Sequence, residues 1–253
     1  MVEREMVHPD DDEVDEVVEV VEEPQAAEDD GHGAPSAQRA LVFAAAALAV
    51  LLVGAAIGML ITRATIDEPS VPTAGSVDVG FAQDMAVHHT QAVTMATIEL
   101  GRSSDPEVRN LAFDIQTSQQ NQVGQMNGFL AVWNQPLFGS GTYMKWMAGP
   151  AGHGGMGGMD MSADGVKKMP GMATTAELTK LRTLSGKELD VYFLQLMIRH
   201  HEGGAPMAQY ALDHAQTDAV RTLADSIIKT QGAEVTTMTE MLAARGAKPL
   251  PAP

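Results

Sequence analysis

The chain has 253 residues, 45% of them apolar, and a formal net charge of −17. Residues 1–38 hold 14 Asp or Glu against one basic residue, so this segment carries most of the excess negative charge. No Lys/Arg cluster follows it, which excludes a nucleic-acid binder. Cysteine is absent, so any sulfur ligand for a metal must be one of the 17 methionines.

The acidic segment 1–38 is predicted to be a disordered arm, because a stretch so rich in charge cannot bury enough apolar surface to fold. We interpret it as a solvated leader. An interaction tail or a cation trap is the alternative function for such a run.

Residues 39–63 are predicted to form a transmembrane helix. The 22 uncharged residues 40–61 match the roughly 20 that span a bilayer core of about 30 Å. A cleaved signal peptide is the competing interpretation, but the apolar run is long and the preceding segment is acidic rather than basic. Arg39 and Arg63 flank the helix and leave its orientation weakly specified. The lack of cysteine and the Met/His content favour an extracytoplasmic position, at the cell membrane, for residues 64–253.

A linker, 64–76, leads to four long helices and one short helix. The expected helices are 77–100, 105–133, 176–183, 185–214 and 218–244. Gly101 is expected to end the first of them. A connector rich in Gly, Met and Pro, 134–173, lies between the second and third long helices, and 246–253 form a tail.

Two of these helices have clear start signals. Asp105-Pro106-Glu107 combines an N-cap, a proline at the first helical position and an acidic first turn. Ser185 and Glu188 have the spacing of a capping box and are expected to start the third long helix.

The region 77–245 contains an internal repeat. Shifting the chain by 112 positions aligns residues 78–130 with 190–242 without a gap, with 19 identities in 53 positions. Each repeat spans two expected helices and is therefore one helical hairpin. Two amphipathic hairpins bury their apolar stripes most simply by packing together, which predicts an all-α four-helix bundle after the apolar helix.

Each repeat carries Met-x-x-His-His followed by a second methionine. The residues are Met85, His88, His89 and Met95 in the first repeat and Met197, His200, His201 and Met207 in the second. Met85, His88 and Met95 follow helical spacing and share one face. His89 lies about 100° further round and still one turn from Met85. Each helix therefore holds thioethers and two imidazoles within reach of one another.

These donor types indicate a soft transition metal. Imidazole suits Cu, Zn, Fe and Ni, whereas a thioether favours Cu(I) among biological metals. The motif offers no charged ligand, and Cu(I) carries a single charge, so we predict copper, as Cu(I). A Ca²⁺ or Mg²⁺ site would need carboxylates, of which the motif has few.

The alternative is that each His-His pair is a core element satisfied by buried polar partners, such as Asp84 one turn before His88. Duplication of the pair with Met at the same offset favours the metal site. Gln119 and Gln231 are expected to hydrogen-bond across the core rather than to bind metal.

The connector adds further candidate donors. It contains His153 and seven methionines, Met144, Met147, Met156, Met159, Met161, Met169 and Met172. The stretch 153–161 has no helical spacing, so its methionines are not expected in a core. A flexible Met run suits Cu(I) capture, and a surface loop with incidental methionines is the alternative. Trp133, Tyr143 and Trp146 are expected to pack the connector against the end of the bundle.

The segments Phe-x-x-x-Met-x-x-His-His at 81–89 and Met-Ile-Arg-His-His-Glu-Gly-Gly-Ala-Pro-Met-Ala at 197–208 resemble the domain-of-unknown-function family 305 (DUF305). The resemblance covers about 78–245 and implies a ferritin-like four-helix fold. It also implies an exported or membrane-anchored protein that binds copper through the eight Met and His residues named above. It assigns no enzymatic activity.

The sequence departs from the family's pattern in two places. The family tends to carry Gln-x-x-Glu on its second and fourth helices; Gln231 and Glu234 keep it, but the first repeat has Gln119 and Gln122. Pro206, inside the third long helix, is expected to kink it or to release a backbone carbonyl one turn earlier. The two repeats are therefore expected to bind unequally.

These patterns predict a membrane-anchored, extracytoplasmic protein that binds copper for buffering, resistance or delivery. One alternative is a metal-free helical interaction module at the membrane. A ferritin-like metalloenzyme is less favoured, because the di-iron type needs Glu-x-x-His on two helices and neither repeat contains that motif. We therefore predict no enzymatic activity, with a metal ion and the membrane as partners.

Overall fold

The computed structural model describes residues 37–65, 71–148 and 165–251. The predictions for the acidic arm and for the central stretch of the connector, with His153, Met156, Met159 and Met161, lie outside these residues. The chain divides into two compact units, Met1–Glu68 and Pro69–Pro253. All regular secondary structure of the described residues is helical, with one isolated bridge between Tyr143 and Val166.

The first unit contains a single apolar helix, α1 (Ala37–Thr65). Its segment Ala37–Arg63 has a mean hydropathy of 2.7, and none of its residues counts as buried. A helix of this length and composition is suited to cross a bilayer, and a signal sequence has the same properties. The predicted apolar helix is confirmed, and its role as an uncleaved anchor stays a prediction.

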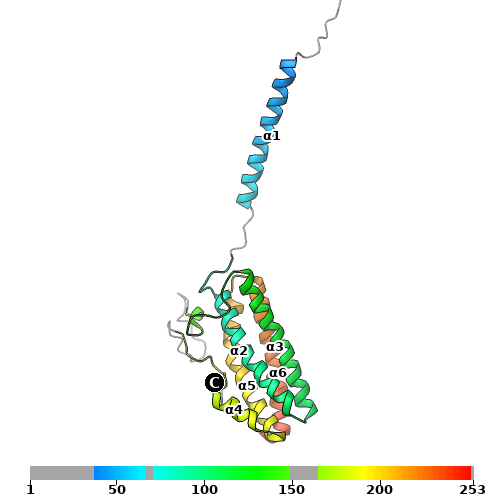
Figure 1. Cartoon of the computed structure of the whole chain (residues 1–253), viewed down its shortest axis with the longest axis vertical. Coiled ribbons are helices and arrows are strands. Elements are labelled where there is room, and N and C mark those ends of the chain that lie inside the picture. Colours follow the sequence, from blue (N-terminus) through cyan, green and yellow to red (C-terminus); the bar gives the residue numbers. More distant parts are fainter. Residues whose placement is uncertain (1–36, 66–70, 149–164, 252–253) are drawn as a thin grey trace, which may run out of the picture. The chain divides into compact units, whose positions relative to one another are not determined.

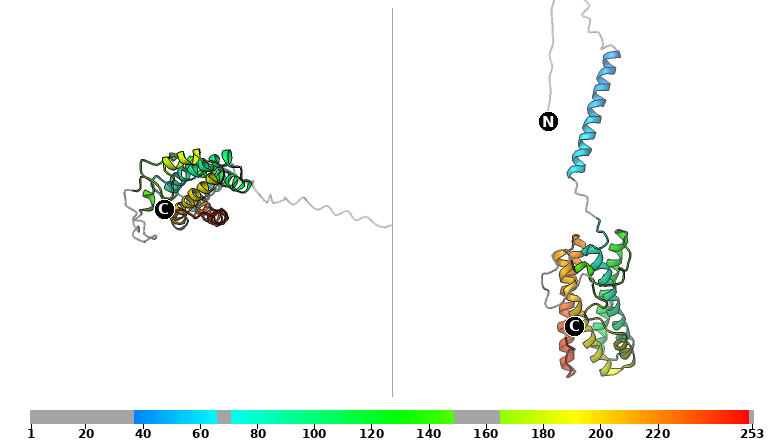
Figure 2. Two further views of the ribbon diagram at one scale, coloured as in Figure 1. Left: turned by 90° about the horizontal axis from the view of Figure 1, so that it is seen from below. Right: turned by 90° about the vertical axis from the view of Figure 1, so that its left-hand side faces the viewer.

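The second unit is built from four long helices. They are α2 (Val77–Arg102), α3 (Pro106–Val132), α5 (Gly186–His214) and α6 (Asp218–Ala244). Figure 1 shows α2 antiparallel to both α3 and α5, and α6 antiparallel to α5. The hairpins α2–α3 and α5–α6 lie side by side (Figure 2) and join mainly through α2 and α5. The predicted all-helical bundle of two hairpins is confirmed; the ferritin-like relationship stays a prediction.

The connector between the hairpins carries two short elements. These are the 3₁₀ helix η1 (Lys145–Met147) and α4 (Thr175–Thr183). Thr174 caps α4 in a capping box with Glu177 that sequence analysis did not single out. The bounds of the four long helices agree with the expected ones within two residues.

Two expected helix ends were wrong in detail. Ser185 is the N-cap of α5, but its side chain makes no capping hydrogen bond. The helix begins at Gly186 with φ at 57°, and a left-handed residue next to the cap changes the geometry on which a capping box depends. Gly101 does not end α2, because the helix continues to Arg102 and the N–H of Ser103 still donates to Glu99 O.

Equivalent aspartates tie each hairpin to the turn of the other. Asp78 on α2 accepts hydrogen bonds from the backbone N–H of Gln216 and Thr217 at 2.8 and 2.9 Å. Asp190 on α5 accepts one from Ser103 Oγ at 2.6 Å. Because Asp78 and Asp190 are equivalent in the repeat, the contact between hairpins follows the symmetry of the sequence.

Candidate metal centre

The four histidines of the repeated motif lie together in the middle of the bundle. His88, His89 and His200 are fully buried, and His201 is 1% exposed. The apolar core is divided into two clusters, one toward each end of the bundle, and neither contains a histidine. The histidines, with Gln119 and Gln231, therefore form a buried polar group between two apolar clusters; we call these six residues the histidine layer.

Three histidines of the layer use the same ring nitrogen for hydrogen bonding. His88 Nε2 donates to Pro170 O at 3.2 Å, and His89 Nε2 donates to Gln122 Oε1 at 2.7 Å. His201 Nε2 donates to Glu234 Oε2 at 2.7 Å. In a neutral ring this leaves Nδ1 as a bare lone pair.

All three Nδ1 atoms are buried without a hydrogen-bond partner. A metal-binding histidine typically donates its second ring N–H to a carbonyl or carboxylate, which fixes the tautomer and orients the ring. His88, His89 and His201 therefore already make the hydrogen bond that would orient a metal-binding ring. Their second nitrogen, Nδ1, is the one that could bind the metal.

Burial keeps the rings of His88, His89 and His200 neutral. Desolvation lowers the pKa of His88 to about 4 and that of His89 to about 3, against an ordinary value of 6.5. Desolvation also lowers the pKa of His200 well below 6.5, and the neighbouring histidines add to the effect. Neutral imidazole is the metal-binding form, so at neutral pH no proton has to leave these three rings before a metal binds.

His200 and the two glutamines have no partners of their own. Neither ring nitrogen of His200 is hydrogen-bonded, and the same holds for both amide atoms of Gln119 and of Gln231. The expected hydrogen bonds of these glutamines across the core are therefore absent, in keeping with the little direct contact between α3 and α6. Buried polar atoms without partners cost free energy, and such atoms are commonly explained by an ion or water.

The four methionines of the motif are fully buried around the layer. Met85 and Met207 belong to the apolar cluster at one end, and Met95 and Met197 to the cluster at the other. Because α2 and α5 are antiparallel, the first methionine of each repeat shares a cluster with the second methionine of the other. The structure thus brings the eight predicted residues into the central part of the bundle, with thioethers on both sides of the imidazoles.

No three His, Cys, Asp or Glu side chains are placed to hold one metal ion in the part of the chain that the structure describes. The rings of His88 and His200 instead contact each other at a tilt of 35°, with centroids 3.8 Å apart. The donors that remain for a low-coordinate soft ion are single imidazole nitrogens together with thioether sulfurs.

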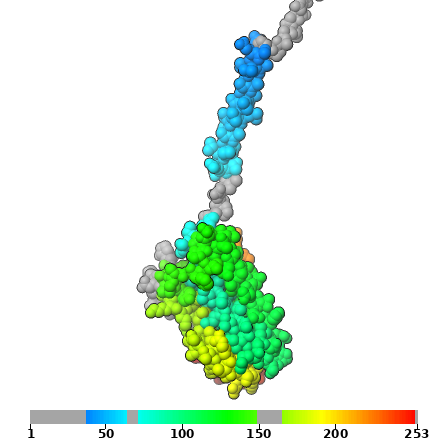
Figure 3. Space-filling view, viewed as in Figure 1, coloured from blue at the N-terminus to red at the C-terminus, as the bar shows by residue number. Residues whose placement is uncertain are grey.

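The connector covers the layer where α2 meets α5. Gln91 holds it with two hydrogen bonds to Ala173, at 3.0 and 2.6 Å. Gly203 on α5 lies so close to Pro170 that an added Cβ would overlap the Pro170 backbone. Figure 3 shows α2 between α3 on one side and the connector with α4 on the other. This side of the histidine layer is therefore closed.

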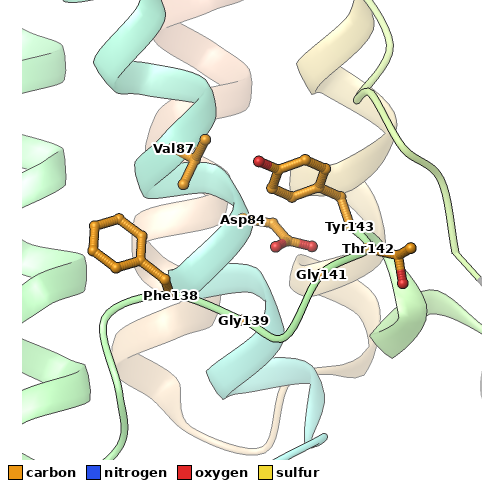
Figure 4. A pocket seen from close by; sticks show the side chains of 7 residues that line it. All are labelled: Asp84, Val87, Phe138, Gly139, Gly141, Thr142 and Tyr143. Atoms are coloured by element: carbon orange, nitrogen blue, oxygen red, sulfur yellow. The ribbon is translucent and has the colours of Figure 1, made fainter.

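Asp84 anchors the other arm of the connector and does not bind a histidine. Its carboxylate accepts hydrogen bonds from Met144 N at 2.6 Å and Trp146 Nε1 at 2.8 Å. Figure 4 shows Asp84 on α2 pointing toward the connector near Thr142 and Tyr143. The alternative in which Asp84 satisfies His88 is therefore wrong, because this carboxylate is already used by the connector.

Part of the connector belongs to the core. Met144, Met147 and Met169 are buried in the same apolar cluster as Met85, and Trp146 packs edge-on against Phe81 with centroids 6.0 Å apart. The packing of Trp146 at the end of the bundle agrees with the expectation. The interpretation of the whole connector as a free loop with incidental methionines is wrong for these three, because their side chains fill core positions.

The fold and the site define a class of all-helical proteins in which paired helical hairpins enclose a buried layer of histidines with methionines on both sides of it. The chain belongs to the family described as "Domain of unknown function (DUF305)", whose model matches residues 78–242. The predicted family is therefore confirmed.

Solved structures of related proteins share the fold. A putative secreted DUF305 protein from Streptomyces coelicolor is 43% identical, with a TM-score of 0.62 over 70% of this chain and 99% of that chain. A DUF305 fragment from Deinococcus radiodurans is 36% identical, with a TM-score of 0.54 over 68% and 99%. The structure of CopM in the Cu(II)-bound form is 24% identical, with a TM-score of 0.50 over 66% and 96%, and is similar in fold.

One further relative matches a shorter part of this chain than the solved structures do. The uncharacterized protein L153 of Acanthamoeba polyphaga mimivirus is 40% identical over 53 residues, which are 21% of this chain and 35% of that protein. The match thus spans about a third of the length of that relative.

Sequence reasoning missed three features of the site. It did not identify Gln122 and Glu234 as the hydrogen-bond partners of His89 and His201, although the equal separation of 33 residues in both repeats was a usable signal. It did not find the Pro170 carbonyl. It also missed Gly204, where an added Cβ would lie 3.0 Å from His88 Cε1.

Proposed function

We propose that the protein binds copper, preferentially as Cu(I), within the histidine layer and the thioethers beside it. The proposed ligands are drawn from Met85, His88, His89, Met95, Met197, His200, His201 and Met207. The observation that carries the proposal is the shared state of three buried histidines, each with Nε2 donating to an oxygen and Nδ1 without a partner.

The donor set favours a soft, monovalent ion. Thioethers select Cu(I), and a neutral donor set leaves a divalent ion poorly compensated in a buried position. The absence of a three-residue His/carboxylate group among the described residues argues in the same direction, since Zn²⁺ sites usually need three or four such ligands. CopM, a protein of similar fold, has been crystallised in a Cu(II)-bound form, which is in keeping with copper as the cargo.

We further propose that α1 is an uncleaved anchor in the cell membrane and that the bundle lies outside the cytoplasm. The long uncharged run of α1 supports this proposal, and the related Streptomyces coelicolor protein is described as putatively secreted. The role proposed for the protein in this position is non-enzymatic: copper buffering, resistance or delivery.

The second candidate is a metal-free helical interaction module. The close contact between the His88 and His200 rings favours it, because the two rings pack on each other without an ion. The two functions differ in whether the unpartnered Nδ1 atoms bind a metal ion.

Competition for Cu(I) tests the proposal. The full chain in detergent is titrated without oxygen against a chromophoric Cu(I) chelator, together with the variant in which His88, His89, His200 and His201 are all Leu. Leucine keeps the layer filled, so the variant can fold, which circular dichroism checks. The control variant is His214→Leu, which removes an exposed histidine of α5. Copper retention by the wild type and the control, lost in the fourfold variant, supports the proposal. Equal retention in all three overturns the site.

Methionine variants separate the two kinds of donor. Met85→Leu with Met197→Leu keeps the core volume nearly constant, since the Leu/Met exchange is close to volume-conserving. Weaker retention of Cu(I) with unchanged thermal stability supports thioether ligation. Unchanged retention excludes Met85 and Met197 as ligands.

A further inference from the structure

The two outer helices, α3 and α6, are the pair of adjacent bundle helices that do not pack closely. Contacts between the hairpins run mainly through α2 and α5. At one end α3 and α6 are joined, because Arg245 at the C-cap of α6 forms an ion pair with Asp105, the N-cap of α3. The positions equivalent to this pair at the other end are Trp133 and Thr217, which cannot form an ion pair. The ion pair between Asp105 and Arg245, which we call the clasp, therefore joins α3 and α6 at one end and has no equivalent at the other.

A groove opens between α3 and α6 toward the unclasped end. Its volume is about 750 Å³. Its walls are mostly hydroxyl and amide side chains, among them Ser118, Gln122 and Gln125 from α3 and Thr222, Ser226 and Thr230 from α6. None of the described residues that line it is Lys or Arg, and Asp218 adds a carboxylate.

The groove reaches the histidine layer at one residue. Gln122 lines the groove, is 8% exposed, and accepts the hydrogen bond from His89 Nε2 at 2.7 Å. A rotation of this single side chain would connect the groove to the imidazoles. The other side of the layer, between α2 and α5, is covered by the connector through Pro170 and Gln91.

The remaining directions lead through apolar core. Each end of the layer is covered by one of the two apolar clusters, and moving an ion through such a cluster carries a large desolvation cost. A groove walled by hydroxyl and amide oxygens avoids that cost, because these groups can replace water around a cation. Its volume also leaves room for several water molecules beside the ion.

We propose that the groove between α3 and α6 is the route by which copper ions reach and leave the histidine layer, with Gln122 at its inner end. The inference rests on the proposed copper binding and adds the path to it. The ligand in transit is a copper ion with its water or small-molecule ligands. The clasp between Asp105 and Arg245 holds the helices together at the far end while the groove stays open.

A groove-filling variant with a symmetry-matched control tests the route. Gln125 lines the groove, and its equivalent in the second repeat, Thr237, does not; both side chains are exposed. The full chain in detergent, as Gln125→Trp, Thr237→Trp or wild type, is loaded with Cu(I), and release into excess chelator is followed by absorbance without oxygen. Ser226→Trp fills the opposite wall and serves as a second groove variant.

Both groove variants are expected to release Cu(I) about tenfold more slowly than the wild type, which corresponds to about 1.4 kcal/mol in the barrier. Thr237→Trp should match the wild type. The equilibrium affinity should be the same in all four proteins, because the variants touch no proposed ligand and a blocked path slows capture and release alike.

Two outcomes overturn the route. One is equal release from Gln125→Trp, Ser226→Trp and Thr237→Trp. The other is faster release from Gln91→Ala, which loosens the connector, with no effect of the groove variants. Both leave copper binding intact and so are distinct from failure of the proposed function, in which the wild type retains no copper and the route falls with it.

Discussion

His88 and His200, equivalent residues of the two repeats, lie in contact with ring centroids 3.8 Å apart and a tilt of 35° between the rings. This contact lies where the two hairpins meet, between α2 and α5. Both rings are buried and both pKa values are lowered, so the contact joins two neutral imidazoles. The contact between the two repeats thus lies in the histidine layer, where buried polar atoms have no hydrogen-bond partner.

The first prediction concerns the free-energy cost of burying ring nitrogens without hydrogen-bond partners. His200 is fully buried with both ring nitrogens unpartnered, so the metal-free protein carries the desolvation penalty of two polar atoms. His200→Leu should raise the free energy of unfolding of the metal-free protein by about 1 kcal/mol or more. Denaturant unfolding followed by circular dichroism measures it. His214→Leu, at an exposed position, should bring no gain, and a loss of stability in His200→Leu would contradict the prediction.

The second prediction uses the difference between the repeats. His201 donates to a carboxylate, Glu234, where the equivalent His89 donates to the amide of Gln122. A carboxylate partner raises the basicity of a histidine ligand, and loss of such a partner typically costs about 10–100-fold in metal affinity. Glu234→Gln should therefore weaken Cu(I) binding by about tenfold or more.

Competition titration against a Cu(I) chelator measures this change. Glu240→Gln, an exposed change of the same kind on the same helix, is the control and should leave the titration unchanged. If Glu234→Gln behaves like this control, the carboxylate partner of His201 does not strengthen Cu(I) binding.

Much of the fold could be predicted because its signals are local. Asp105 accepts hydrogen bonds from Glu107 N and Val108 N, as its position before Pro106 predicts, and caps of this kind depend only on neighbouring residues. The repeat then supplied the pairing of hairpins, since a gapless shift places His88 and His200 in equivalent positions. Helix bounds and the membership of the buried layer follow from these two signals.

The rest of the site depends on contacts that are distant in sequence. The carbonyl of Pro170 meets His88 across 82 residues, and no local pattern marks it. Met144 and Met169 lack helical spacing, yet they are buried because Asp84 and Gln91 hold both arms of the connector against α2. Periodicity identifies a core residue only when the residue lies in a regular element.

The third prediction is a pH dependence of stability. Glu99 is fully buried on α2; desolvation and the nearby Asp190 raise its pKa to about 8 from an ordinary 4.5. The folded protein therefore keeps a proton that the unfolded chain has lost between these two pH values. Stability from the neutral carboxyl group is present at low pH and falls as the pH rises toward 8.

Glu99→Gln removes this titration while keeping a neutral side chain of similar shape. The variant should be more stable than the wild type at pH values near 8 and similar to it near 4.5. Thermal unfolding at several pH values checks the slope. Glu177→Gln should show the opposite pH dependence. The pKa of Glu177 is lowered to about 2, mainly by its hydrogen bonds with Arg199. The stability that this carboxylate contributes is therefore present at neutral pH and is lost as the pH falls toward 2.

The fourth prediction concerns the space beside His88. Gly204 on α5 faces this ring, and an added Cβ would lie 3.0 Å from Cε1 and 3.3 Å from Nδ1, the free nitrogen. Gly204→Ala should therefore displace the imidazole, at an overpacking cost of about 1–3 kcal/mol that the gain in helix propensity, about 1 kcal/mol, only partly offsets. Gly232→Ala is the matched control, because Gly232 lies on α6 with nothing within 4 Å of an added Cβ. This variant should gain stability from helix propensity alone.

Denaturant unfolding separates the overpacking cost from the gain in helix propensity, and Cu(I) titration reports on His88. The expected result is weaker Cu(I) binding in Gly204→Ala and unchanged binding in Gly232→Ala. Unchanged binding in both variants would show that His88 Nδ1 does not contact the ion, and would leave the remaining imidazoles as the ligands.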